Sequence, residues 1–352
     1  MNAVQVAPAP APHATGVELV RRAARGPVRR RRLVIAGTAV LVLALFAART
    51  LLGDYTITVP DFFRILTGTQ IPGASFILME VKLPRAVLAV LVGFAFGVAG
   101  AVFQATLRNP LASPDVIGIS AGASASAVVA IVAFGWSGSM VSLAAVVGAL
   151  GCAVVIRLVA GPGGTHRLVL AGIGLAAAML SVIHYFFTRA DEWDTQLVLR
   201  WLTGSVSQAN WSQIGVLALI LVVLLPLVAW AARGLRVVEL GEETAYALGE
   251  GPARQALLLV LATLLAAVGV AAAGPVAFVA FLSGPIARFL NAGRTTLLAS
   301  GFVGAALLVG GDYIGDYAVG NVNFPVGVVT GALGAPFLLW LVATGRTGRR
   351  AS

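Results

Sequence analysis

Residues able to carry out chemistry are scarce in this chain, and their spacing excludes the common kinds of catalytic site. The one lysine, Lys82, lies in the segment MEVKLPR, and no glycine-rich loop precedes it. A phosphate-binding loop needs glycine backbone amides together with a lysine, so the sequence predicts no nucleotide site in this chain. The single cysteine, Cys152, lies inside an apolar segment, where we interpret it as a small buried side chain.

The three histidines have no metal-ligand spacing. His13, His166 and His184 lie far apart, and Cys152 is too isolated to join them. The sequence therefore predicts neither a metal site nor a catalytic residue. His184 is the one ionisable side chain in the middle of an apolar segment. A packed or interfacial histidine is the favoured interpretation, and a role in a transport path is the alternative.

The composition is that of a polytopic membrane protein. Of the 352 residues, 59% are hydrophobic and 11% are charged, whereas roughly a quarter of the residues of soluble domains are charged. Several apolar stretches exceed 18 residues, and about 20 residues of helix cross the hydrocarbon layer of a bilayer. The net charge of +10 would suggest nucleic-acid binding in a soluble protein. Here the basic residues gather at the ends of apolar segments, so we expect no nucleic-acid partner.

Ten apolar segments are candidate transmembrane helices, which predicts an all-α fold for residues 33–345. They run from Leu33 to Leu52, Pro84 to Leu107, Val116 to Phe134, Met140 to Ala160, Arg167 to Thr188, Trp211 to Ala232, Pro252 to Ala272, Val276 to Leu290, Thr296 to Gly311 and Phe324 to Thr344. The eighth and ninth segments are short. Leaving out either one would place later arginines on the outside, so ten crossings is the consistent number.

The distribution of basic residues predicts the orientation. With the amino terminus inside, 18 basic residues lie on the cytoplasmic side and 6 lie outside, which predicts that both termini are cytoplasmic. Residues 1–32 are rich in alanine and proline and then basic, so we expect a disordered cytoplasmic tail. A cleaved signal peptide is the disfavoured alternative, because the basic region is long. Residues 346–352 would form a second cytoplasmic tail.

Two connections and one glycine face stand out between and within these segments. Arg189 to Asn210 is expected outside, with tryptophans suited to the membrane interface. Arg233 to Gly251 is expected inside, and its centre, about residues 239–249, has the pattern of a short charged helix that meets another protein. Gly93, Gly97 and Gly100 share one helical face, which favours close packing of a second helix.

Three stretches carry a resemblance to a known family. The first contains Leu83-Pro84-Arg85, the glycines through Gly100, Gln104, Arg108-Asn109-Pro110-Leu111-Ala112, Pro114-Asp115 and Gly118-Ile119-Ser120-Ala121-Gly122-Ala123. The second runs from Leu240 to Gly249, and the third from Gly274-Pro275 to Pro336-Phe337. In these residues the chain resembles the FecCD-type permeases, the membrane subunits of ATP-binding-cassette (ABC) importers for ferric siderophores, haem and cobalamin. The resemblance implies a ten-helix fold.

The resemblance also implies roles for particular residues. Lys82 and Arg85 match basic residues that dock a substrate-binding protein, with interfacial snorkelling as the alternative interpretation. A cytoplasmic gate would comprise Asn109, Pro110 and Leu111 with Thr165 and His166. Coupling to the ATPase would involve Gly241, Glu242, Glu243, Thr244, Ala245, Leu248 and Gly249.

The partners follow from the same resemblance. We expect a transport subunit in the bacterial inner membrane that is not itself an enzyme and binds no cofactor. Two ATP-binding subunits would hold ATP and Mg, and a substrate-binding protein or lipoprotein would deliver a ferric siderophore or related metal chelate. An ion-coupled secondary transporter is the alternative function.

Two departures from the family pattern affect these expectations. Gly284-Pro285 stands where the family often has Pro-His, and Asp316 stands where it often has an arginine. An acidic residue at a docking position favours a heterodimer with a homologous permease over a homodimer, because the homologue would supply the missing basic residue.

Overall fold

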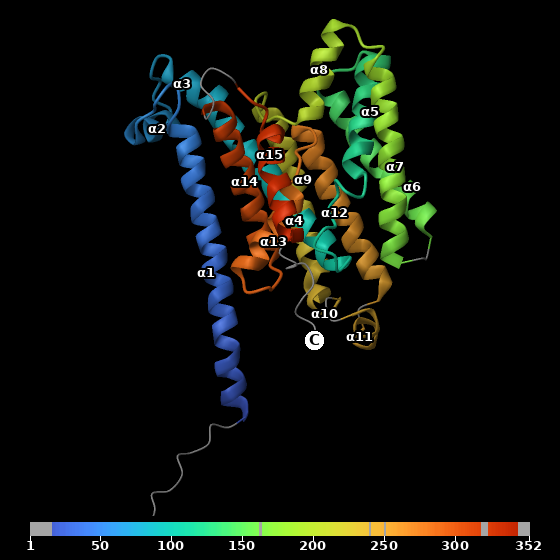
Figure 1. Cartoon of the computed structure of the whole chain (residues 1–352). Helices are drawn as coiled ribbons and strands as arrows, with labels where there is room; N and C mark the ends of the chain where they lie inside the picture. Colours follow the sequence, from blue (N-terminus) through green and yellow to red (C-terminus); the bar gives the residue numbers. More distant parts are fainter. Residues whose placement is uncertain (1–15, 162–163, 239–240, 250, 318–322, 344–352) are drawn as a thin grey trace, which may run out of the picture.

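The computed structural model describes residues 16–161, 164–238, 241–249, 251–317 and 323–343, and their regular structure is helical (Figure 1). The elements are α1 (Gly16–Leu51), α2 (Val59–Leu66), α3 (Ala74–Phe76), the π-helix η1 (Ile77–Lys82), α4 (Leu83–Thr106), α5 (Ile119–Phe134), α6 (Ser139–Ala160), α7 (Gly164–Phe187), α8 (Glu192–Thr203), α9 (Trp211–Ala231), the 3-10 helix η2 (Ala232–Gly234), α10 (Leu235–Val238), α11 (Glu242–Ala247), α12 (Pro252–Ala273), α13 (Val279–Leu290), α14 (Leu297–Tyr317) and α15 (Val326–Ala343).

Each of the ten expected segments coincides with one helix. Seven helical runs among the described residues are long and apolar enough to cross a membrane: α1, the run from α3 to α4, α6, α7, α9, α12 and α14. The other three, α5, α13 and α15, are apolar but shorter. The all-α, multi-pass membrane fold is therefore confirmed, while the number of crossings and their orientation stay predictions.

Helix α1 begins at Gly16, well before the expected start at Leu33. Part of the expected disordered tail is thus helical, and residues 1–15 lie outside the described residues. Arginine and alanine are good helix formers. Once a helix is nucleated in the apolar span, each further residue that becomes helical adds one backbone hydrogen bond, so the helix extends readily. As a result, α1 projects beyond the bundle at the end where α10 and α11 lie (Figure 1).

Two short helices lie in connections that periodicity alone did not reveal. The backbone N–H of Asp61 donates to Thr58 Oγ1 at 3.3 Å at the start of α2, and that of Asp194 donates to Asp191 Oδ1 at 2.8 Å at the start of α8. Such caps satisfy amide groups that have no partner inside the helix. Both α2 and α8 lie at the end of the bundle opposite α10 and α11 (Figure 1).

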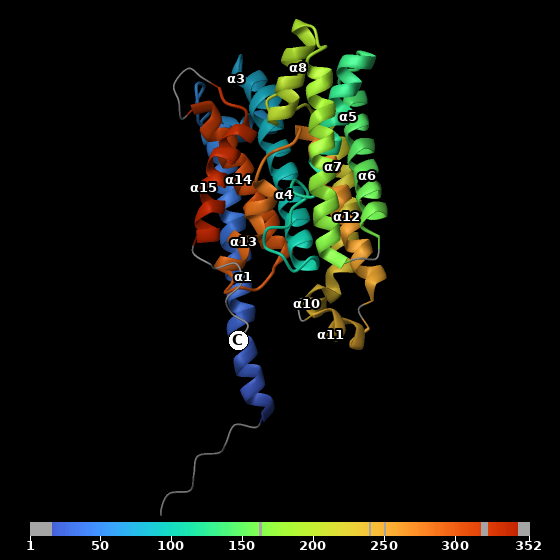
Figure 2. The same ribbon diagram turned by 45° about the vertical axis from the view of Figure 1, so that its right-hand side comes forward.

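Helix α4 lies at the centre of the bundle. Helices α1, α13, α14 and α15 lie on one side of it, and α5, α6, α7 and α12 on the other (Figure 2). The glycine face allows this close packing: a Cβ on Gly93 would lie 2.5 Å from Gly304 O, and Cβ atoms on Gly97 and Gly100 would collide with the carbonyls of Ser300 and Ala280. The predicted role of these glycines is confirmed.

Candidate functional site

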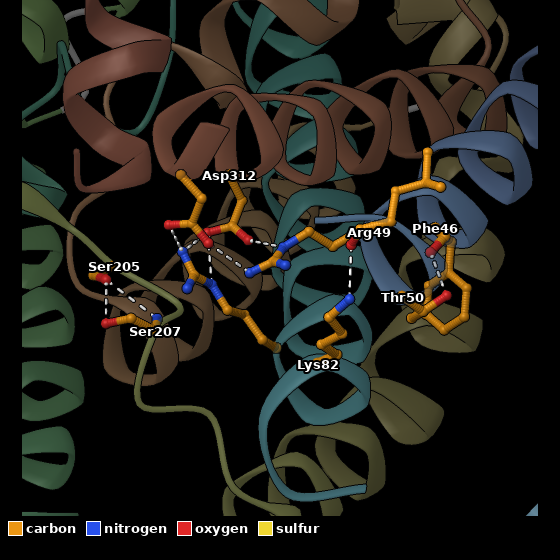
Figure 3. A network of polar contacts seen from close by, with 10 residues as sticks. Phe46, Arg49, Thr50, Lys82, Ser205, Ser207 and Asp312 are labelled. Carbon is orange, nitrogen blue, oxygen red and sulfur yellow. Dashed lines mark hydrogen bonds and ion pairs between the residues drawn. The ribbon is translucent and has the colours of Figure 1, made fainter. Parts of the chain in front are cut away.

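A cluster of four charged side chains joins three helices at the α2 and α8 end of the bundle. Arg49 of α1 donates to Asp312 Oδ2 at 2.7 Å and to Asp316 Oδ2 at 2.8 Å. Arg85 of α4 donates to Asp312 Oδ1 at 2.7 Å and to Asp316 Oδ1 at 2.8 Å. Both carboxylates come from α14, and Figure 3 shows Arg49 and Asp312 facing each other. The two positive and two negative charges balance.

The members of this cluster are almost fully buried, so each charge depends on the others for stability. The side chain of Asp312 is 1% exposed and that of Arg49 is 3% exposed. Charges removed from water in this way need partners on every side, because a buried ion with none is strongly destabilising. The sequence held one signal for the cluster: Asp312 and Asp316 are four residues apart, which places both on one helix face. It held none for Arg49, which is one of the six basic residues expected outside.

Lys82 lies one helical turn from Arg85 but in different surroundings. Its ammonium group donates to the carbonyls of Leu52 at 2.7 Å and Tyr55 at 2.5 Å, and the residue is 4% exposed. Leu52 directly follows α1, so the cation sits against the carboxyl end of that helix, where positive charge is favoured. The two predicted docking residues are therefore close together in the fold, and each has partners within the chain.

At the other end of the bundle, α4 ends in a tight turn that contains the first predicted gate residues. Asn109 Oδ1 accepts from the backbone N–H of Leu111 at 2.9 Å, and Arg108 has a positive φ of 50°. Asparagine stabilises such turns by bonding to backbone two residues ahead. Asn109, Pro110 and Leu111 are half-buried, and Ala112 is buried. The turn thus lies against the bundle.

The segment after this turn holds a carboxylate in an unusual setting. Ser120 donates its hydroxyl to Asp115 Oδ1 at 2.5 Å. The other oxygen, Oδ2, is buried and has no hydrogen-bond partner among the described residues.

The predicted coupling segment, about residues 239–249, contains α11, and α10 lies directly before it. Ala245 is buried, whereas Thr244, Leu248 and Gly249 are exposed. Gly241, with a φ of +118°, begins the helix, and a Cβ there would lie 3.8 Å from Arg108 Nη1. The structure therefore brings the end of α4 and the start of α11 together.

Four predicted site residues have side chains outside the described part of the structure. Thr165 and His166 belong to the first turn of α7, and Glu242 and Glu243 to the first turn of α11. The α7 pair is helical because α7 begins at Gly164, before the expected start at Arg167, and the α11 pair agrees with the short helix expected there.

His184 lines a cavity of about 400 Å³ between α5, α7 and α8. Ser120 and Ser124 of α5 line the same cavity. His184 is exposed in this single chain, so the interfacial interpretation and the transport-path interpretation both remain.

The departure at Gly284-Pro285 has a compensation within the fold. Proline has no N–H, so Pro285 inside α13 leaves the carbonyl of Phe281 without its usual helical donor. Gln104 of α4 donates its Nε2 to this carbonyl at 2.9 Å. Gly284 leaves room for the amide, because a Cβ there would collide with Gln104 Oε1. A side chain from another helix therefore replaces the missing backbone donor.

Comparison with known proteins identifies the family. The FecCD transport family matches residues 40–344. The ferric enterobactin transport system permease protein FepG of Escherichia coli (strain K12) is 33% identical over 322 residues, covering 90% of this chain and 97% of the relative. The achromobactin transport system permease protein CbrC of Dickeya dadantii (strain 3937) is 36% identical over 310 residues, covering 86% and 88%.

A solved structure shares the fold. A metal-chelate type ABC transporter in an inward-facing conformation has a TM-score of 0.75 and 22% sequence identity, covering 89% of this chain and 99% of that chain. The family match and the relatives extend over most of the chain and confirm the resemblance noted in the sequence. This multi-pass membrane protein belongs to the FecCD transport family.

Proposed function

We propose that this chain is the permease subunit of an ABC importer that carries a ferric siderophore or related metal chelate across the bacterial inner membrane. The observation that carries the proposal is the match to FepG, a ferric enterobactin permease protein, along 97% of its length. CbrC, an achromobactin permease protein, matches to a similar extent. The substrate class is the one that these relatives share.

The proposal includes ten crossings with both termini in the cytoplasm. Among the described residues, seven helical runs meet the length for crossing, and the shorter α5, α13 and α15 are predominantly apolar. Short helices can complete a crossing where the adjoining irregular backbone is buried in protein. The segment before α5 meets this condition at Ala112, Ser113 and Ile117, which are all buried.

For docking of a substrate-binding protein, the geometry favours Arg85 over Lys82. The Arg85 side chain is 14% exposed and shares its two carboxylate partners with Arg49, so a carboxylate of the binding protein could join or replace Asp316. Lys82 is 4% exposed, and two backbone carbonyls already occupy its ammonium group.

For gating and coupling, the support is the closeness of Arg108, which follows α4, to Gly241 at the start of α11. The gate would comprise Asn109, Pro110 and Leu111 together with Thr165 and His166. Two ATP-binding subunits, which hold ATP and Mg, would bind α11 through Thr244, Leu248 and the neighbouring exposed Tyr246. Because Arg108 lies beside Gly241, movement of α11 would be transmitted directly to the gate turn.

The assembly would contain a second, homologous permease. A heterodimer remains the favoured arrangement, since Asp316 is acidic and bonded to Arg49 and Arg85 within this chain. It therefore offers the binding protein no basic group at that position.

The function is tested by uptake of iron-55-labelled ferric siderophores into vesicles that contain the full complex. We expect uptake that requires internal ATP, the binding protein and an ATPase with an intact phosphate-binding lysine. An ion-coupled transporter is the second candidate, favoured by the buried carboxylates of Asp115, Asp312 and Asp316. Asp312 and Asp316 are paired with arginines here. Uptake that survives ATPase inactivation and collapses with an ionophore would reject the ABC mechanism.

The coupling role is tested by Glu243→Arg. We expect this reversal on α11 to weaken assembly with the ATP-binding subunits, measured by co-purification, and to uncouple ATP hydrolysis from the binding protein. Glu192→Arg on α8, an exposed position at the other end of the bundle, makes the same charge change and should leave assembly intact. Normal assembly and coupled hydrolysis in Glu243→Arg would contradict the role.

A further inference from the structure

A cavity of about 550 Å³ lies outside the docking, gate and coupling segments. Helices α6 and α9 both pack against α12 and form its walls, and α8 with the following loop lies at its end. Leu143 of α6 and Val216 of α9 line the cavity and are 57% and 60% exposed. The cavity is therefore a groove that opens sideways, toward the surface that the bilayer covers.

The lining changes from apolar to polar along this groove. Its floor contains Leu88, Ile131, Leu217 and Val268, which are buried and apolar. Its end, formed by the first turns of α6 and α9 and by α8, carries hydroxyl and amide groups. Of these, Ser139, Gln208 and Ser212 are exposed and make no side-chain hydrogen bond to a described residue. A ligand with an apolar chain and a polar head matches this order.

The charge at the polar end is positive. Arg200 lines the cavity, and no carboxylate among the described residues lies within ion-pair distance of it. The lining residues include no acidic side chain. Trp201 also lines the cavity, and its Nε1 is buried without an acceptor among the described residues. Arg200 is the charged group of this lining, so it is the group that would attract an anionic ligand.

The position matches the membrane interface. Helix α9 has 21 residues, so at 1.5 Å per residue it spans about the thickness of the hydrocarbon layer, and its first turn lies near one boundary. Trp201 and Trp211 lie at this level, and tryptophan is enriched at such boundaries. A phosphate of a lipid would therefore lie at the height of Arg200.

We propose that this groove binds one anionic phospholipid, with its phosphate at Arg200 and part of one acyl chain between α6 and α9. The remaining chain lies in the bilayer. The Arg200 guanidinium donates to the phosphate oxygens, a charge-assisted contact that favours a headgroup with no compensating positive charge. The site is thus specific for an anionic over a zwitterionic lipid, and it does not depend on which chelate is carried.

The experiment measures lipid binding to the purified, delipidated full complex by native mass spectrometry. Phosphatidylglycerol and phosphatidylcholine with the same acyl chains are titrated separately. We expect one phosphatidylglycerol to bind more tightly than phosphatidylcholine, and Arg200→Gln to weaken phosphatidylglycerol by about tenfold while changing phosphatidylcholine little. Arg189→Gln is the matched control, because Arg189 precedes α8, stacks on Tyr185 at 4.4 Å and does not line the groove.

A second variant tests the chain-binding part. Val216→Trp fills the groove at an exposed position and should weaken both lipids, and a photoactivatable phosphatidylglycerol should cross-link to residues 139–146 and 212–220 in the unmodified complex. Equal binding of the two lipids, unchanged by Arg200→Gln, would overturn the proposal. So would displacement of phosphatidylglycerol by inorganic phosphate at equal concentration, because that outcome assigns the site to a free anion.

Discussion

At the scale of single residues, the four-charge cluster shows how a membrane helix bundle tolerates ions. Each carboxylate of α14 bonds to both Arg49 and Arg85, so the cluster has no net charge and its groups are almost fully shielded. Taken together, such buried ion pairs add little to the free energy of folding, because the cost of removing the charges from water offsets their mutual attraction. Their importance appears when one member is removed and the others stay buried.

We predict that Asp312→Asn lowers the free energy of unfolding by about 3–5 kcal/mol, because two arginines lose a shared anion. Asp61→Asn is the control: its carboxylate pairs with Arg64 at 3.6 Å at the surface, and exposed pairs contribute about 0–1 kcal/mol. Thermal unfolding in detergent measures both. Similar melting temperatures for the two variants would contradict the structural role of the cluster.

The contact between Gln104 and Phe281 gives a second residue-scale prediction. Gln104→Leu leaves the Phe281 carbonyl without a donor and should cost about 1–3 kcal/mol. In a Pro285→Ala background the backbone N–H of residue 285 can donate to that carbonyl, so the same substitution should cost less. Unfolding of the two single variants and the double variant completes the cycle. Equal costs in both backgrounds would show that Gln104 does not replace the missing donor.

At the scale of elements, α4 holds the bundle together through backbone contact. Its glycines lie directly against carbonyl groups of α13 and α14, and backbone atoms cannot move aside as a side chain can. The spacing of four and three residues predicted this face from sequence. The sequence did not show which helices would lie against it.

We predict that Gly97→Ala lowers stability by about 1–3 kcal/mol, the usual cost of overpacking, because the added methyl group meets the Ser300 carbonyl. Gly151→Ala on α6 is the matched control, since a Cβ there would meet no atom within 4 Å. That change should be neutral or slightly stabilising, because alanine favours helix. Chemical denaturation of the two variants compares them, and an equal loss would contradict close backbone packing at α4.

At the scale of the whole molecule, local sequence patterns predicted the helical segments. They did not predict the contacts between residues that are far apart in the sequence. The apolar runs, Cys152 and the glycine face were readable because each depends on neighbours within a few turns. The bond from Arg49 to Asp312 joins residues 263 positions apart, and nothing local marks such a pair. The helical start at Gly16 was missed because a basic, proline-containing stretch has a disordered composition even when a membrane helix extends it.

The ten-crossing topology gives a whole-molecule prediction. A reporter fused after Gly320 should lie outside the cytoplasm, because an odd number of crossings precedes it in this topology. A phosphatase active only outside the cytoplasm, and a fluorescent protein that folds only inside, report the two sides. Fusion after Arg346 is the control and should read as cytoplasmic. A cytoplasmic reading after Gly320 would reject ten crossings.

The central position of α4 has a consequence for how a signal could cross the membrane. One continuous helix carries Arg85 in its first turn and leads directly into Arg108, which lies beside Gly241 at the start of α11. Gln104, the glycine face and the charge cluster fasten this helix to α13, α14 and α1. We therefore expect these four helices to move as one rigid body. A tilt imposed at either end would then move the other end without unwinding any helix.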